Sequence, residues 1–154
     1  MRVNAGGNPA SPTAGVYSDT FNVFAQYPNS DAGVLSPNAP VVMTVGVTSQ
    51  CVFNTYPGNL VFNYTAFSAS AQTANTSFML RCSSGLSWSI SVSPNPAVLQ
   101  GLQYTITPAP SSGSGNGNTG QSVTLTGSMP AGQAGTCSGP VCTATQAHTV
   151  TITY

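Results

Sequence analysis

The chain has 154 residues, a mass of 15.6 kDa and 40% hydrophobic residues, and its two basic residues balance its two acidic ones. This size and apolar content suffice for one hydrophobic core. Charged residues make up only 3% of the chain, which excludes the charged outer faces of surface helices and the clustered cations of a nucleic-acid-binding protein.

The polar residues are mainly Ser, Thr, Asn, Gln and Gly, a composition typical of strands and turns. Thr, Val, Tyr and Phe favour pleated sheet, and 16 Gly and 12 Pro residues interrupt the chain. We therefore predict an all-β protein. An uncharged surface also tolerates association with copies of itself, because charge repulsion between them is weak. The absence of a long apolar run argues against membrane insertion.

Residues 1–37 are predicted to be an N-terminal extension that contains an extra strand and a linker. The first fifteen residues are rich in Gly, Pro and Asn, and they lack the apolar stretch of a signal peptide, as expected of a processed chain or a fragment. Alternation predicts the extra strand at about residues 16–27, with one face formed by Phe21, Val23, Ala25 and Tyr27. The turn residues of 27–40 indicate a linker.

Residues 41–48, VVMTVGVT, show the clearest period of two in the sequence. The apolar face of this predicted strand consists of Val41, Met43, Val45 and Val47. Any half-buried strand alternates in this way. The pattern therefore also fits the ordinary first strand of a complete, monomeric sandwich.

Further short strands are predicted at residues 60–67, 76–82, 88–92, 102–106, 123–127 and 146–154. They are separated by turn residues, of which the longest stretch is 108–120. Residues 115–120 match the pattern G-x-G-x-x-G, but a strand and not a helix follows, so we interpret them as a flexible hairpin loop. Short strands at these intervals predict a β-sandwich.

Four cysteines, Cys51, Cys82, Cys137 and Cys142, lack the close-spaced pairs of a zinc site, even with His148 as an added ligand. An even number of cysteines favours two disulfides and an oxidising environment. Of the three possible pairings we favour Cys51 with Cys82 and Cys137 with Cys142.

Catalysis is not expected from this composition. Acid–base chemistry needs a paired acid and base, and the candidates Asp19, Asp31 and His148 lie on separate predicted segments. No G-x-S-x-G motif is present, and no cofactor is expected. A sugar-binding platform would need the aromatic residues Trp88, Tyr64, Phe67 and Tyr104, which we interpret instead as core.

From residue 51 to residue 154 the order of features resembles the spore coat protein U family, which includes subunits of archaic chaperone-usher pili. The resemblance rests on Cys51 at the end of the first strand and on the stretches NLVFNYTAF, SFMLRCSSGLSWSISVSP, GLQYTI, VTLTGSMPAGQ and HTVTITY. The family pattern Gly-x-Tyr-x-Asp-Thr is missing before the last strand. It occurs instead at residues 15–20, GVYSDT.

The resemblance implies that residues 38–154 form an immunoglobulin-like sandwich that lacks one strand. In such pilins a periplasmic chaperone fills the gap, an outer-membrane usher assembles the subunits, and the N-terminal strand of a neighbouring subunit then replaces the chaperone. Residues Val41, Met43, Val45 and Val47 are the expected donor strand. The resemblance thus implies a structural subunit of an extracellular, cell-surface fimbrium, or alternatively a fibre-tip adhesin that binds a surface or glycan through loops such as 108–120.

The extra strand repeats the terminal strand of the chain. Residues 20–23, TFNV, align with residues 149–152, TVTI. Two explanations remain open: residues 15–27 are the last strand of a preceding, truncated domain, or they are a spare strand that completes this sandwich or a neighbour's. Both predict that Phe21 and Val23 are buried against a sheet, and we favour the second.

Overall fold

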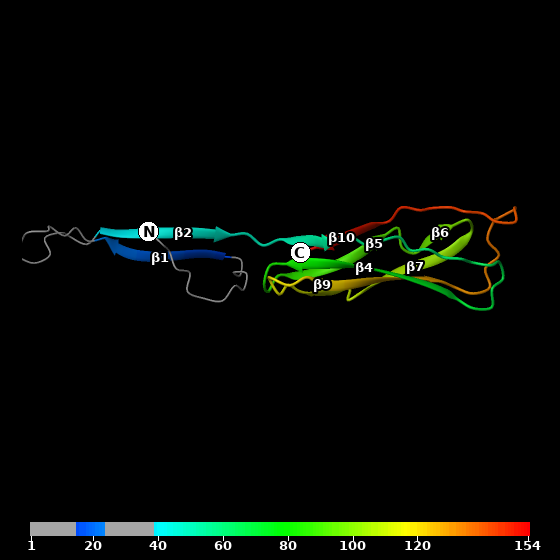
Figure 1. Cartoon of the computed structure of the whole chain (residues 1–154), viewed down its shortest axis with the longest axis horizontal. Helices are drawn as coiled ribbons and strands as arrows, with labels where there is room; N and C mark the ends of the chain where they lie inside the picture. Colours follow the sequence, from blue (N-terminus) through cyan, green and yellow to red (C-terminus); the bar gives the residue numbers. More distant parts are fainter. Residues whose placement is uncertain (1–14, 24–38) are drawn as a thin grey trace, which may run out of the picture.

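The computed structural model describes residues 15–23 and 39–154, which contain strands and connecting segments but no helix. The prediction of an all-β fold is therefore confirmed for these residues. None of them belongs to a helix of membrane-spanning length and hydropathy. Figure 1 shows a sandwich of two sheets and a separate hairpin that projects from the end of the sandwich where β3 begins.

The larger sheet has five antiparallel strands in the order β3-β4-β9-β7-β6. Their bounds are Cys51–Thr55 for β3, Gln72–Cys82 for β4, Gln121–Met129 for β9, Leu102–Ala109 for β7 and Ala97–Leu99 for β6. The smaller sheet has the order β10-β5-β8, with bounds Thr149–Thr153, Ser87–Ser93 and Ser112–Ser114. Five of the strands predicted within the sandwich thus occur with shifted ends, and β3, β6 and β8 were not predicted.

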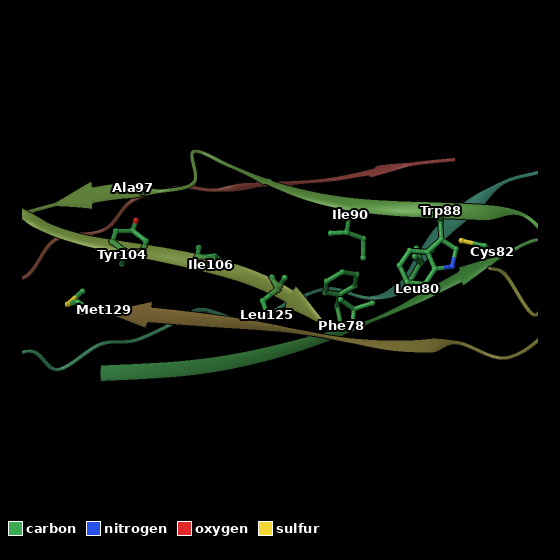
Figure 2. Close-up of a cluster of buried hydrophobic side chains, with 11 residues drawn as sticks. Phe78, Leu80, Cys82, Trp88, Ile90, Ala97, Tyr104, Ile106, Leu125 and Met129 are labelled. Carbon is green, nitrogen blue, oxygen red and sulfur yellow. The ribbon is translucent and has the colours of Figure 1, made fainter. Parts of the chain in front are cut away.

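The hydrophobic core lies between the two sheets. It contains Phe78, Leu80, Cys82, Trp88, Ile90, Ala97, Tyr104, Ile106, Val123, Leu125 and Met129. Figure 2 shows Trp88 and Ile90 pointing from β5 toward Phe78 and Leu80 of β4. Alternate residues of β9 are buried, as expected for a strand with one face on a core. Trp88 and Tyr104 are core residues and Tyr64 packs against the core, but the interpretation of Phe67 as core is wrong, because it is 73% exposed.

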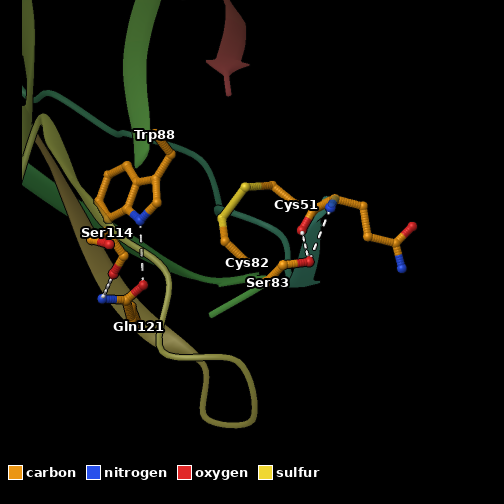
Figure 3. Close-up of a disulfide and its surroundings, with 7 residues drawn as sticks. Cys51, Cys82, Ser83, Trp88, Ser114 and Gln121 are labelled. Carbon is orange, nitrogen blue, oxygen red and sulfur yellow. Dashed lines mark hydrogen bonds between the residues drawn. A yellow bond between two sulfur atoms is a disulfide. The ribbon is translucent and has the colours of Figure 1, made fainter. Parts of the chain in front are cut away.

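Both disulfides join the pairs favoured from the sequence, Cys51 with Cys82 and Cys137 with Cys142. Cys51 lies opposite Cys82 where β3 begins and β4 ends. Close by, the Trp88 indole nitrogen donates a hydrogen bond to Gln121 Oε1, and the Gln121 amide donates to the backbone oxygen of Ser114 (Figure 3). Two disulfides are typical of oxidising, extracytoplasmic environments.

The predicted flexible loop at 115–120 is wrong in part. Gly115 and Gly117 are buried, and their amide groups donate hydrogen bonds to the backbone oxygens of Leu86 and Cys82 at 2.8 and 3.1 Å. A Cβ at Gly115 would collide with the backbone oxygen of Ser83. Close approach of two backbones, and not mobility, therefore explains this glycine.

The alternative interpretation of residues 41–48, as the ordinary first strand of a complete sandwich, is wrong. β2 (Ala39–Val47) belongs to neither sheet of the sandwich and pairs instead with β1 (Gly15–Val23) in a two-stranded antiparallel sheet. β1 thus does not complete the sandwich of its own chain. Ala25 and Tyr27 of the predicted extra strand lie outside the described residues, as do the side chains of Phe21 and Val23.

Candidate functional site

One extended segment contributes side chains to the core but has no backbone partner in the described parts of the chain. Residues 60–67 were predicted as a strand, yet the structure has no strand there. Leu60, Phe62 and Tyr64 are half-buried and pack against the core, whereas Val61 and Asn63 are exposed. Among the described residues, no backbone–backbone hydrogen bond involves 59–64. We call residues 59–64 the unpaired segment.

Side chains hold the unpaired segment in place. A Cβ added at Gly127 of β9 would lie 2.5 Å from Phe62 Cζ and 3.3 Å from Leu60 Cδ1, so both side chains lie directly over this glycine. The Tyr64 hydroxyl accepts a hydrogen bond from the backbone N–H of Gln133 at 2.8 Å. The segment therefore has the alternation of a strand, and its backbone donors and acceptors remain available to an incoming one.

The terminal strand β10 has one edge without a partner strand among the described residues. β10 pairs with β5 along one side, and in the described part of the chain no strand pairs with its other side. Val150 and Ile152 pack against the core but are only half-buried. We call this side of β10 the open edge.

Tyr104 lies between the unpaired segment and the residues that precede β10. Its ring centroid is 6.1 Å from that of Phe62 and 5.6 Å from that of His148. Its hydroxyl donates to Gln146 Oε1 at 2.8 Å and lies 2.7 Å from His148 Nε2. The residues that precede β10 and the unpaired segment thus border the same part of the core, at Tyr104.

His148 carries a buried nitrogen without a partner. Because Tyr104 donates its single hydroxyl proton to Gln146, Nε2 of His148 must donate to the Tyr104 oxygen, and Nδ1 is then an acceptor. This Nδ1 is buried and has no hydrogen-bond partner among the described residues. Burial of an unpaired acceptor costs about 1–3 kcal/mol. A hydrogen-bond donor arriving at this position would remove that cost.

Replacing Tyr104 by Phe is expected to lower the free energy of unfolding by about 1–3 kcal/mol, because Gln146 and His148 both lose their buried partner. Equilibrium denaturation measures the loss. Tyr154→Phe makes the same chemical change at an exposed residue and is the matched control, with an expected effect below about 0.5 kcal/mol. Equal losses in the two variants would contradict the role given to Tyr104.

Burial raises the pKa of Tyr104 above its ordinary value of 10.0. The folded protein then keeps this proton at pH values at which the unfolded chain has lost it. The resulting contribution to stability is present below pH 10 and is lost as the pH rises through the pKa of the folded state. Tyr104→Phe should remove this alkaline part of the pH dependence.

The β1–β2 hairpin exposes apolar side chains on both faces. The exposed fractions lie between 41% and 76% for Val16, Tyr17, Val41, Val42, Met43 and Val45. An isolated two-stranded sheet is marginally stable in water, and apolar patches of this kind mark contact surfaces. The hairpin therefore presents the predicted donor residues Val41, Met43 and Val45 to solvent, whereas the fourth, Val47, is half-buried.

The structure separates the remaining candidate residues. Asp19 lies on the hairpin, His148 lies beside β10, and Asp31 is outside the described residues. Within the described residues no group of three or more His, Cys, Asp or Glu side chains is placed to hold a metal ion. The cluster of Tyr104, Gln146 and His148 was not predicted from the sequence. The sequence contained one indication of it: Gln146, His148 and Val150 follow one another at intervals of two residues, so all three belong to the same face of the predicted strand.

Comparisons of the chain with protein-family models, curated proteins and solved structures found no match.

Proposed function

We propose that the protein is a structural subunit of an adhesive surface fibre in which strand β2 of one copy completes the sandwich of the next. The observation that carries this proposal is the coexistence of two features in one chain. The sandwich has an open edge and an unpaired segment over the same core. The same chain projects strand β2, on which the alternate residues Val41, Met43 and Val45 are exposed.

β-Augmentation is the recognition mode that suits these features. An incoming strand pairs its backbone with sheet edges, and every second side chain enters the core. The half-buried residues Val150, Ile152 and Phe62 would gain cover from such side chains. Each fully buried Val or Met stabilises by about 1.5–3 kcal/mol. A chain with two acidic and two basic residues offers little charge repulsion to association.

The finer parts of the proposal come from the resemblance to the spore coat protein U family. The completed sandwich would have immunoglobulin-like topology, with β2 as its missing strand. Assembly would require a periplasmic chaperone and an outer-membrane usher, and the fibre would lie on the cell surface. The two disulfides support passage through an oxidising compartment.

A fibre-tip adhesin is the alternative within the same architecture. It would bind a surface or glycan through loops such as 108–120, in which Asn116, Asn118 and Thr119 are exposed beside the anchored glycines. This alternative predicts binding to a glycan array or to abiotic surfaces by a chain that does not form multimers. If the protein is instead a subunit of the fibre shaft, we expect it to form multimers.

The test is the state of association of the purified full chain. After incubation at high concentration we expect multimers in size-exclusion chromatography that persist in SDS without boiling. A synthetic peptide of residues 39–48 should suppress them by occupying the open edge, whereas the same peptide with Val45→Asp should not. A chain that stays monomeric at every concentration and does not bind the peptide would contradict the proposal.

A further inference from the structure

The repeated strand shows how β2 pairs with a strand of this type. Residues 20–23 of β1 have the same pattern as residues 149–152 of β10. In the structure β1 pairs with β2 in an antiparallel ladder that sets Phe21 opposite Val41 and Asp19 opposite Met43. The hairpin is therefore a complex, within one chain, between the donor strand and a strand that resembles β10.

We propose, on the basis of the proposed function, that β2 of one copy lies antiparallel along the open edge of β10 in a second copy, in the register of the β1–β2 ladder. If residues 149–152 of β10 take the places of residues 20–23 of β1 in this ladder, Val41 lies opposite Val150 and Val42 lies opposite Thr149. Continuing along the ladder sets Met43 opposite His148 and Val45 opposite Gln146.

The side-chain contacts near β10 agree with this register. Residues directly opposite each other in an antiparallel pair point to the same face. His148 and Val150 are half-buried, and Gln146, although exposed, accepts a hydrogen bond from the buried Tyr104, so these alternate side chains lie on the core side of the strand. Their partners in β2 would be Val45, Met43 and Val41, all apolar. A slip of one residue would turn Thr44 and Gly46 inward instead.

The buried acceptor of His148 lies where the ladder would continue beyond β10. β10 begins at Thr149, but the inward alternation extends back to Gln146. Strand β2 has nine residues and β10 has five, so β2 reaches past the start of β10. Its backbone N–H groups would then run beside His148, where Nδ1 has no partner among the described residues.

One consequence is competition between two strands. Each residue of an antiparallel ladder directs its backbone N–H and C=O to one side only. A β10 strand in the register of β1 would therefore use the same backbone groups of β2 that β1 uses now. β1 and the β10 of a second copy cannot occupy this edge of β2 together, so β1 must separate before β2 is donated.

Cysteine pairs across the proposed ladder test the register. One full-length chain carries Val42→Cys and the other, with a mass tag, carries Thr149→Cys; a second pair uses Thr44→Cys and Ala147→Cys. Directly opposite residues lie about 4.5–5.5 Å apart between Cα atoms, within disulfide range. We expect both pairs to form tagged heterodimers, because only the antiparallel register satisfies both. Thr151→Cys with Val42→Cys is the matched control, at about 7–8 Å.

The outcomes separate the register from the function. Multimers that form with both cross-links, at least about tenfold above the control, support the proposal. Multimers that form the control cross-link between positions 42 and 151, or that form neither of the two expected cross-links, overturn the proposed register. They do not contradict the proposed function as a fibre subunit. Absence of multimers overturns the proposed function itself.

A lock on the hairpin tests the competition. Thr20 and Val42 are directly opposite in the β1–β2 ladder, so Thr20→Cys with Val42→Cys ties β1 to β2 when oxidised. The oxidised variant should lose multimer formation, while the same variant with its two added thiols alkylated before oxidation should assemble. If the locked chain forms multimers as fast as the unlocked chain, β1 and the β10 of a second copy do not compete for the same edge of β2.

Discussion

Val45→Asp is expected to abolish multimer formation while leaving the sandwich as stable as in the unaltered chain. Val45 is 46% exposed on the hairpin, so a carboxylate there remains in water while the chain is monomeric. In the proposed register the same side chain would turn to the core side of the strand, opposite Gln146, whose side chain contacts the buried Tyr104. Burial of an unpaired charge costs several kcal/mol, which corresponds to a loss of more than about a hundredfold in association.

Thr44→Asp is the matched control for this variant. Thr44 precedes Val45 on β2 and is also exposed, but its side chain would face solvent after donation. Both variants add the same charge to the same strand. A difference in multimer formation between them is therefore due to the face of β2 on which the charge lies. Multimers of the Val45→Asp chain at the level of the Thr44→Asp chain would contradict the donor role of residues 41–47.

The Val45→Asp chain should still accept a strand. Its open edge and its unpaired segment are unaltered, because β2 is not part of the sandwich. Mixing it with the unaltered chain should therefore cap growing multimers and shorten them. Size-exclusion chromatography of mixtures at several ratios measures this effect. A Val45→Asp chain that neither forms nor enters multimers would instead indicate damage to the acceptor side.

Of the two disulfides, Cys51–Cys82 is expected to contribute more to the stability of the protein, so its removal should cause the larger loss. The cysteines are 31 residues apart, which corresponds to about 3.7 kcal/mol in the chain-entropy treatment. For the separation of 5 between Cys137 and Cys142 the same treatment yields about 2 kcal/mol. Cys82 is also a core residue, whereas Cys137 and Cys142 are exposed.

Double replacement by Ala avoids free thiols and tests each disulfide separately. We expect Cys51→Ala with Cys82→Ala to lower the midpoint of thermal unfolding by roughly 10 °C, about twice the effect of Cys137→Ala with Cys142→Ala. Calorimetry or circular dichroism measures both. An equal or smaller effect of the first pair would show that residues 51–82 are already constrained in the unfolded chain.

The Cys51–Cys82 disulfide also has a place in the proposed assembly. Three residues, 48–50, separate the end of β2 from the start of β3. The Ser83 hydroxyl lies within hydrogen-bond distance of the Gln50 backbone and accepts from its N–H at 3.0 Å. A force on a donated β2 would therefore reach the sandwich at Cys51, where a covalent bond ties β3 to β4.

The strands with one buried face were predictable from the sequence. In β4, β5 and β9, alternate apolar side chains lie on one core, so the period of two appears in the sequence. The short strands β6 and β8 escaped prediction because three residues carry too little periodicity. The contact of Tyr104 with Gln146 and His148 joins residues more than 40 positions apart, a pairing that no local pattern records.

The sequence by itself predicted the alternating apolar face of residues 41–47 and a strand over residues 146–154, and it favoured the two disulfide pairs. Only the tertiary structure decided which backbone lies beside each strand: β2 pairs with β1, and Leu60, Phe62 and Tyr64 alternate without a partner strand. The physical reason is that side-chain alternation reports burial, whereas backbone hydrogen bonds are the same for every residue and leave no mark in the sequence.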